Sequence, residues 1–217
     1  MKQADLQTIL DKVEFLFERY SMTRRASTQP YMLKVAQEQI PDYSYGPDNE
    51  LVRETLIEHV GSLPMLAIEL FPNISDPEVD LARALEMLAI HDIGELVTGD
   101  EMTFTKKPDG AALEHQAALK LLDPMYHDLY NEVEGKTTKS AKFAKSIDKI
   151  NPDIIDYLMP PDITIWRYRH FMGTNADQII DLIVKHKRPY MLWNPFMTGF
   201  HIFLMDRLAD KLKTENN

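Results

Sequence analysis

The sequence of 217 residues contains no cysteine. This absence excludes a disulfide framework, a thiolate zinc site, an iron–sulfur cluster and a cysteine nucleophile. Any metal that the chain binds must therefore be held by imidazole and carboxylate groups. Long apolar runs are also absent, since none approaches the ~18–20 residues that span a bilayer. The start Met1–Asp5 does not read as a signal peptide, so we expect a cytoplasmic protein without a membrane segment.

Basic residues are the minority among the charged ones. Lysine and arginine number 24 against 34 aspartates and glutamates, which gives a formal net charge of −10. A general binder of nucleic-acid backbones needs a basic face, so this balance argues against nucleic acid as a partner. A small phosphorylated substrate stays open, because a metal and a few local cations can reverse the potential inside one pocket. We find no glycine-rich phosphate loop, Gly-x-Ser-x-Gly elbow or dinucleotide fingerprint.

Apolar residues follow a helical period through most of the chain, and no clear alternation with period two appears. The fourth expected helix has Asp76 as its N-cap and Thr98-Gly99 as its stop. The sequence predicts an all-α fold in one domain, 1–217, with a core of about 50–157 and a C-terminal helical extension of about 158–217. The expected helices cover about 6–17, 31–39, 50–71, 76–97, 111–122, 138–157, 176–187 and 198–213.

The segment His91–Asp100, HDIGELVTGD, contains four groups that can bind a metal or transfer a proton. The apolar residues before it read as a buried helix, so His91 and Asp92 fall where polar groups are costly. An unpaired buried carboxylate costs on the order of several kcal/mol, and a divalent metal is the simplest compensating charge. His59 and Asp148 lie among aliphatic residues in two other predicted helices, and we expect both to point inward as well.

Four residues occur in an order that is typical of one enzyme family: His59, His91, Asp92 and Asp148. The set resembles the HD-domain superfamily of metal-dependent phosphohydrolases. A longer match adds three acids and is similar to the branch that contains the bacterial 5′-deoxynucleotidases: Glu58 beside the first histidine, then Glu95 and Asp100. The resemblance covers about residues 50–150, and it implies an HD-domain helical bundle with additional C-terminal helices.

The resemblance also implies roles for these side chains. His59, His91, Asp92 and Asp148 would be the metal ligands. Two histidines with two carboxylates suit Mn²⁺, Co²⁺, Zn²⁺ or Fe²⁺ better than Mg²⁺, which prefers oxygen ligands. Glu95 would orient or deprotonate the attacking water, and Asp100 would protonate the leaving 5′-oxygen or contact the sugar. The function implied is removal of phosphate from a small phosphomonoester, above all a nucleoside or deoxynucleoside 5′-monophosphate.

Such an enzyme also needs cations that bind the substrate phosphate. Lys106 occupies a position similar to a lysine of the related nucleotidases, with Lys107 as its neighbour, and a solvated loop pair is the alternative. Those enzymes carry an Arg-Trp pair upstream of the first histidine, whereas this chain has no tryptophan before position 166. Arg24, Arg25 and Arg53 are the available substitutes. This departure bears on nucleotide specificity and leaves the metal site untouched.

Two other classes of function stay open. A di-iron oxygenase of the same superfamily would require His115 or His127 to bind a second metal. A non-catalytic module that binds a nucleotide would keep the metal but would not need Glu95 or Asp100. A homodimer is also open, because the helices beyond residue 175 carry enough apolar surface either for a partner or for packing onto the core.

Overall fold

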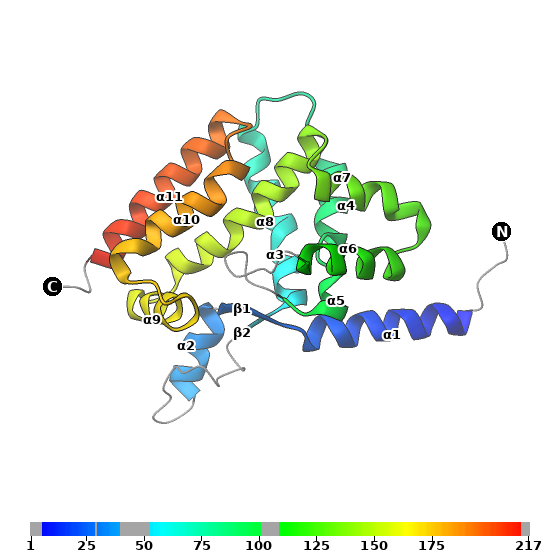
Figure 1. Cartoon of the computed structure of the whole chain (residues 1–217), viewed down its shortest axis with the longest axis horizontal. Coiled ribbons are helices and arrows are strands. Elements are labelled where there is room, and N and C mark those ends of the chain that lie inside the picture. Colours follow the sequence, from blue (N-terminus) through cyan, green and yellow to red (C-terminus); the bar gives the residue numbers. More distant parts are fainter. Residues whose placement is uncertain (1–5, 29, 40–52, 101–108, 214–217) are drawn as a thin grey trace.

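The structure is a computed structural model that describes residues 6–28, 30–39, 53–100 and 109–213. They form a bundle of helices with one small sheet (Figure 1), which confirms the predicted all-α class. The strands are β1 (Arg24–Thr28) and β2 (Arg53–Thr55). The α-helices are α1 (Leu6–Met22), α2 (Pro30–Gln39), α3 (Leu56–Leu70), α4 (Leu81–Ile90), α5 (Glu95–Thr98), α6 (Gly110–Leu121), α7 (His127–Gly135), α8 (Lys139–Leu158), α9 (Pro161–Met172), α10 (Ile179–Lys187) and α11 (Pro195–Lys213).

The long helix α8 lies at the centre of the bundle and contacts α3, α4, α7 and α11. In Figure 1, α10 and α11 lie on one side of it, and α3, α4 and α7 lie on the other. Phe143, Ile147 and Ile150 repeat at helical spacing on α8 and are fully buried. Leu204 and Leu208 of α11 belong to the same apolar cluster. The C-terminal helices therefore share one core with the helices that precede them.

The small sheet is a feature that the sequence analysis did not predict. β1 and β2 are antiparallel, with Arg24 paired to Thr55 and Thr28 paired to Arg53. The strand sequences, RRAST and RET, are short and polar, so they show no alternation of apolar and polar residues. The pairing joins the segment after α1 to the start of α3, and it brings Arg25 beside β2, where Arg53 Nε donates to the Arg25 carbonyl at 2.8 Å.

Two helices begin later than expected. α3 begins at Leu56, after a capping box in which Glu58 N donates to Thr55 Oγ1 and Thr55 N donates to Glu58 Oε2. α4 begins at Leu81, and its N-cap is Asp80, whose carboxylate accepts from Arg83 N. Asp76 caps only the turn that precedes α4, since its carboxylate accepts from Glu78 N. Because Ser, Thr and Asp cap turns and helices alike, the choice between nearby candidates depends on packing.

The helix expected over 76–97 is interrupted at the functional segment. α4 ends at Ile90, residues 91–94 form a tight turn, and α5 begins at Glu95. The turn is held by backbone bonds of the i to i+3 type, including Glu95 N to Asp92 O at 3.0 Å. His91 and Glu95 therefore do not lie one turn apart on a continuous helix. His91 and Asp92 lie in this turn, and both are buried.

The remaining differences lie in the second half of the chain. The helices α7 and α9 were not predicted, because the α7 sequence HDLYNEVEG is short and polar and the aromatic α9 sequence PDITIWRYRHFM has a weak amphipathic pattern. The aromatic side chains at and just before the start of α11 divide between two environments: Trp193, Phe196 and Phe200 pack against the core, while Phe203 is 55% exposed. Among the described residues, no helix is long and apolar enough to cross a membrane.

Gly94 generates a prediction about folding. A Cβ on Gly94 would lie 2.3 Å from the backbone oxygen of Glu114 in α6, a clash that a side-chain rotation cannot relieve. We expect Gly94→Ala to lower the free energy of unfolding by roughly 2 kcal/mol or more, measured by urea denaturation. Gly61→Ala is the matched control, because nothing lies within 4 Å of its added Cβ in α3. The control should be neutral or stabilising by up to about 1 kcal/mol; equal stability of the two variants would contradict the account.

Candidate metal centre

Four polar side chains from three parts of the bundle meet in its interior. His59 comes from α3, His91 and Asp92 come from the turn after α4, and Asp148 comes from α8. One ligand-type atom from each lies within 4.8 Å of the others, and all four residues are buried. His59 Nε2 lies 3.4 Å from Asp148 Oδ1, and His91 Nε2 lies 3.1 Å from Asp92 Oδ2. The structure thus brings together the four residues that the sequence analysis grouped.

The two histidines present their Nε2 atoms to this cluster. His91 Nδ1 lies 2.9 Å from the carbonyl oxygen of Leu88, which can only accept, so Nδ1 carries the proton of the neutral ring. His59 Nδ1 lies 3.2 Å from Asn151 Oδ1. The amide nitrogen of Asn151 donates to Ser62 Oγ, so its oxygen faces His59 and accepts the proton of Nδ1. Both Nε2 atoms are buried and have no hydrogen-bond partner among the described residues. Two such nitrogens beside two carboxylates fit a divalent transition metal.

The charges in the cluster are strongly coupled. Burial alone raises the pKa of Asp148, but Lys149, with Nζ 2.9 Å from Oδ2, and the two histidines hold it well below its usual range. Burial lowers the pKa of His91, yet the charges of Asp92 and Asp148 outweigh it and raise the value to about 10. Burial and the charge of Arg25 lower the pKa of His59. The carboxylates therefore stay ionised in the interior and attract positive charge.

Arg25 supplies a second positive charge from within the chain, beside Asp92. Its side chain is 11% exposed, and Nη1 lies 2.9 Å from Asp92 Oδ2 and 3.5 Å from Glu95 Oε2. The same atom lies 3.9 Å from Asp100 Oδ1, while Nε faces Glu54 Oε2 at 3.6 Å. Arg25 thus contacts one of the candidate metal ligands and both of the candidate catalytic acids. It reaches them from β1, a strand that lies between the first two helices expected from the sequence.

Glu95 lies at the first position of α5 and is buried beside Asp92. Burial raises its pKa well above the usual range for glutamate, and the charge of Asp92 raises it further. Glu114 of α6 approaches the same place, so that Asp92, Glu95 and Glu114 form a second group with oxygens within 4.8 Å of one another. A buried carboxyl with a raised pKa is a candidate for proton transfer in a reaction.

The cations that were expected to bind phosphate lie in different places. Lys106 and Lys107 lie outside the described residues. Arg24 Nη1 donates to the backbone oxygen of Arg53, and Arg53 donates to that of Arg25, so both side chains bond the sheet backbone. Arg25 is the one of the three arginines whose ion pairs reach the cluster. The position of Arg25 follows from strand pairing rather than from any local sequence motif.

The histidines considered for a second metal lie elsewhere. The ring of His115 lies 5.4 Å from the ring of Tyr130 between centroids and is tilted by 50°, and His127 Nε2 lies 3.4 Å from the carbonyl oxygen of Leu122. In the part of the chain that the structure describes, neither belongs to a group of three or more metal-binding side chains. Glu58, the acid beside His59 in the longer motif, forms part of the capping box of α3.

Two polar residues close to the cluster were not singled out from the sequence. Asn151 follows Asp148 by three residues in α8 and therefore shares its face, which is a signal that the sequence contained. Glu54 is 1% exposed and lies between Arg25 and His59. Burial raises the pKa of Glu54 to about 7, although Arg25 opposes the shift. Glu54 lies in the short strand β2, whose sequence has no amphipathic pattern from which its burial could be predicted.

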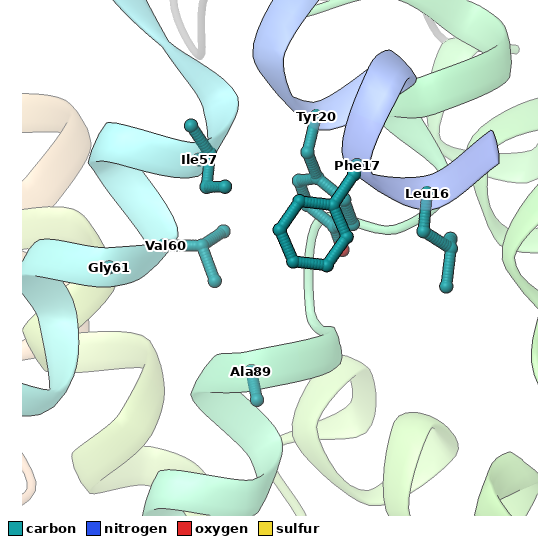
Figure 2. A pocket seen from close by; sticks show the side chains of 7 residues that line it. All are labelled: Leu16, Phe17, Tyr20, Ile57, Val60, Gly61 and Ala89. Carbon is teal, nitrogen blue, oxygen red and sulfur yellow. The ribbon is translucent and has the colours of Figure 1, made fainter. Parts of the chain in front are cut away.

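An apolar pocket of about 290 Å³ lies between α1, α3 and α4 (Figure 2). It is lined by Leu16, Phe17, Tyr20, Ile57, Val60, Gly61 and Ala89. Tyr20 of this lining has a pKa that is raised by burial and by the charges of Asp92 and Glu95. The pocket lining carries no charged side chain.

The geometry predicts that one divalent metal binds per chain. His91→Ala and Asp148→Ala should each abolish the binding of Mn²⁺, measured by calorimetric titration, because each removes one of four converging ligands. The same variants should lose the rise in melting temperature that a metal gives to a protein whose folded state binds it. His115→Ala and His127→Ala are the controls and should bind one ion with unchanged affinity. Two ions per chain, with loss of one in a control, would support the di-iron alternative instead.

Comparison with known proteins places this site in a family. The HD-domain family model matches residues 47–160, which include all four clustered residues. A structure from Magnetospirillum magnetotacticum MS-1, named a predicted metal-dependent phosphohydrolase, aligns with a TM-score of 0.60 at 21% identity, over 94% of this chain and 93% of that one. A conserved hypothetical protein from Pyrococcus furiosus aligns with a TM-score of 0.55 at 17% identity, over 91% and 99%. No curated protein matches the sequence. Since the family model covers more than half of its residues, the chain belongs to the HD-domain family.

Proposed function

We propose that this protein is a metal-dependent phosphohydrolase that removes phosphate from a small phosphomonoester. The observation that carries the proposal is the buried cluster of His59, His91, Asp92 and Asp148, in which both histidine Nε2 atoms have no hydrogen-bond partner among the described residues. The similar structure from Magnetospirillum magnetotacticum, named as a predicted metal-dependent phosphohydrolase, agrees with this reading. The longer motif with Glu58, Glu95 and Asp100 leads us to propose a nucleoside or deoxynucleoside 5′-monophosphate as the substrate.

The four clustered residues would hold Mn²⁺, Co²⁺, Zn²⁺ or Fe²⁺. The metal would polarise the phosphate and lower the pKa of a nearby water. Arg25 would bind a phosphate oxygen, because its guanidinium already lies at hydrogen-bond distance from Asp92, which is one of those four residues. A planar guanidinium that offers several N–H groups suits the oxygens of phosphate. Phosphoryl transfer depends mainly on such positioning and charge neutralisation.

Glu95 and Asp100 would handle protons on either side of the phosphate. Glu95 is buried against Asp92, and its raised pKa allows it to accept a proton from the attacking water. Asp100 lies 3.9 Å from Arg25, beyond the end of α5, where it would protonate the leaving oxygen or contact the sugar. Both roles follow from placing the phosphate beside Arg25.

The direct test is a panel of phosphomonoesters supplied to the purified protein with Mn²⁺, Co²⁺ or Mg²⁺. We expect release of inorganic phosphate from 5′-monophosphates with Mn²⁺ or Co²⁺, and loss of that release after chelation. Tight nucleotide binding without any release of phosphate across all metals would favour a non-catalytic binding module. Oxygen-dependent turnover that requires iron would favour the oxygenase.

Glu95→Gln gives a sharper prediction about the mechanism. It removes the proton acceptor but keeps the size of the side chain, so kcat should fall by about 10²–10⁴-fold. The affinity for Mn²⁺ should stay within about threefold of the unmodified protein, since Glu95 is not one of the four converging ligands. Glu69→Gln, at an exposed position of α3, is the matched control and should retain full activity. Full activity of Glu95→Gln would exclude Glu95 as the proton acceptor.

A further inference from the structure

We propose that Glu54 is a positioning residue that holds the Arg25 guanidinium in place for the substrate phosphate. The proposal rests on the proposed function, and it assigns a role to a side chain that the family motif did not point to. Glu54 would act through Arg25 and would touch neither the metal nor the substrate.

The first observation is that Arg25 is bordered by acids on two edges. On one edge, Nη1 faces Asp92, Glu95 and Asp100. On the other edge, Nε faces Glu54 Oε2 at 3.6 Å. Glu54 is 1% exposed, so water does not screen this contact as it would at the surface. The carboxylate of Glu54 thus limits how far the guanidinium can turn away from the cluster.

The second observation is that the facing atoms of this pair are both unsatisfied. Arg25 Nε and Glu54 Oε2 are buried and have no hydrogen-bond partner in the described structure. Their separation of 3.6 Å exceeds the usual 2.7–3.2 Å of an N–H···O bond by well under ~1 Å. Leaving a buried polar atom unpaired is costly, so a small shift of Arg25 toward Glu54 would be favourable for both groups.

The third observation is that Arg25 and a metal would share one ligand atom. Arg25 Nη1 lies 2.9 Å from Asp92 Oδ2, and the same oxygen lies 3.1 Å from His91 Nε2 within the candidate metal centre. Two positive groups on one carboxylate oxygen repel each other. Arg25 is therefore expected to withdraw from Asp92 when a metal binds. Glu54 is the acid placed on the opposite edge, where it can hold the withdrawn guanidinium close to the metal centre.

The sheet fixes this arrangement in the backbone. Arg25 belongs to β1 and Glu54 to β2, and the two strands pair antiparallel. Arg53 Nε also donates to the Arg25 carbonyl oxygen at 2.8 Å. Glu54 Oε2 lies 3.8 Å from His59 Nδ1, but that nitrogen is already bonded to Asn151 at 3.2 Å. Arg25 is thus the partner whose orientation depends on Glu54.

Calorimetric binding of inorganic phosphate to the Mn²⁺-loaded protein tests the proposal without requiring turnover. Glu54→Met removes the acceptor and should weaken phosphate binding by about tenfold, as expected for the loss of one charge-assisted hydrogen bond. Glu54→Gln keeps an oxygen acceptor and should recover part of the loss. The affinity for Mn²⁺ should stay within about twofold in both variants. Glu58→Gln is the matched control, because Glu58 caps α3 and should leave phosphate binding unchanged.

A double-mutant cycle with Arg25→Ala makes the test specific. Because Glu54 acts through Arg25, Glu54→Met should cause no further loss of phosphate affinity in the Arg25→Ala background. An undiminished tenfold loss in that background would overturn the proposal. So would unchanged phosphate binding in Glu54→Met, a parallel loss of Mn²⁺ affinity, or a wild-type protein that binds no phosphate.

The outcomes also separate this proposal from the proposed function. Phosphate binding that depends on Glu54, in a protein that hydrolyses no monoester, would leave the proposal standing and remove the proposed function. Hydrolysis with a kcat/KM that Glu54→Met does not change would leave the proposed function standing and overturn the role of Glu54. A rise in KM with little change in kcat is the result expected if both hold, since Glu54 affects how the phosphate is held.

Discussion

The structure depends on the burial of several acids in one small region of the bundle. Glu54, Asp92, Glu95 and Asp148 are each at most 7% exposed, and ionised carboxylates in an apolar interior require compensating charge. Arg25 and Lys149 supply part of it from within the chain. The histidines supply more only when protonated, and their Nδ1 contacts leave Nε2 directed at the carboxylates. A divalent cation would satisfy Asp92, Asp148 and the two Nε2 atoms together.

The elements around the cluster are arranged to meet this requirement. The turn over residues 91–94 directs His91 and Asp92 inward, and Gly94 lets α6 approach without a side chain between them. α8 carries Asp148 and Asn151 on one face, so a candidate ligand and the partner of His59 come from the same helix. The small sheet adds Arg25 and Glu54 from segments that are distant in the sequence. α8 and the sheet thus each contribute a charged side chain together with a second polar side chain that contacts the same site.

Much of this site was predictable from the sequence, and the reason is physical. His59, His91, Asp92 and Asp148 lie in apolar helical segments where polar residues are costly, and their order matches a family motif; the structure brings them within 4.8 Å of one another. The contact between Arg25 and Glu54 was not predictable, because it depends on strand pairing that leaves no local pattern. The end of α4 at Ile90 also went unpredicted, since the apolar period continues while the backbone turns. Glu114 approaches through the close contact of Gly94 with α6, which is again a tertiary effect.

The central claim is that the buried cluster holds a metal ion at one defined position. Anomalous diffraction from crystals grown with Mn²⁺ tests it most directly. The account predicts one strong anomalous peak per chain, coordinated by the Nε2 atoms of His59 and His91 and by the carboxylates of Asp92 and Asp148. A peak between Asp92, Glu95 and Glu114 alone would contradict it, as would the absence of any peak at the cluster in crystals that contain the metal.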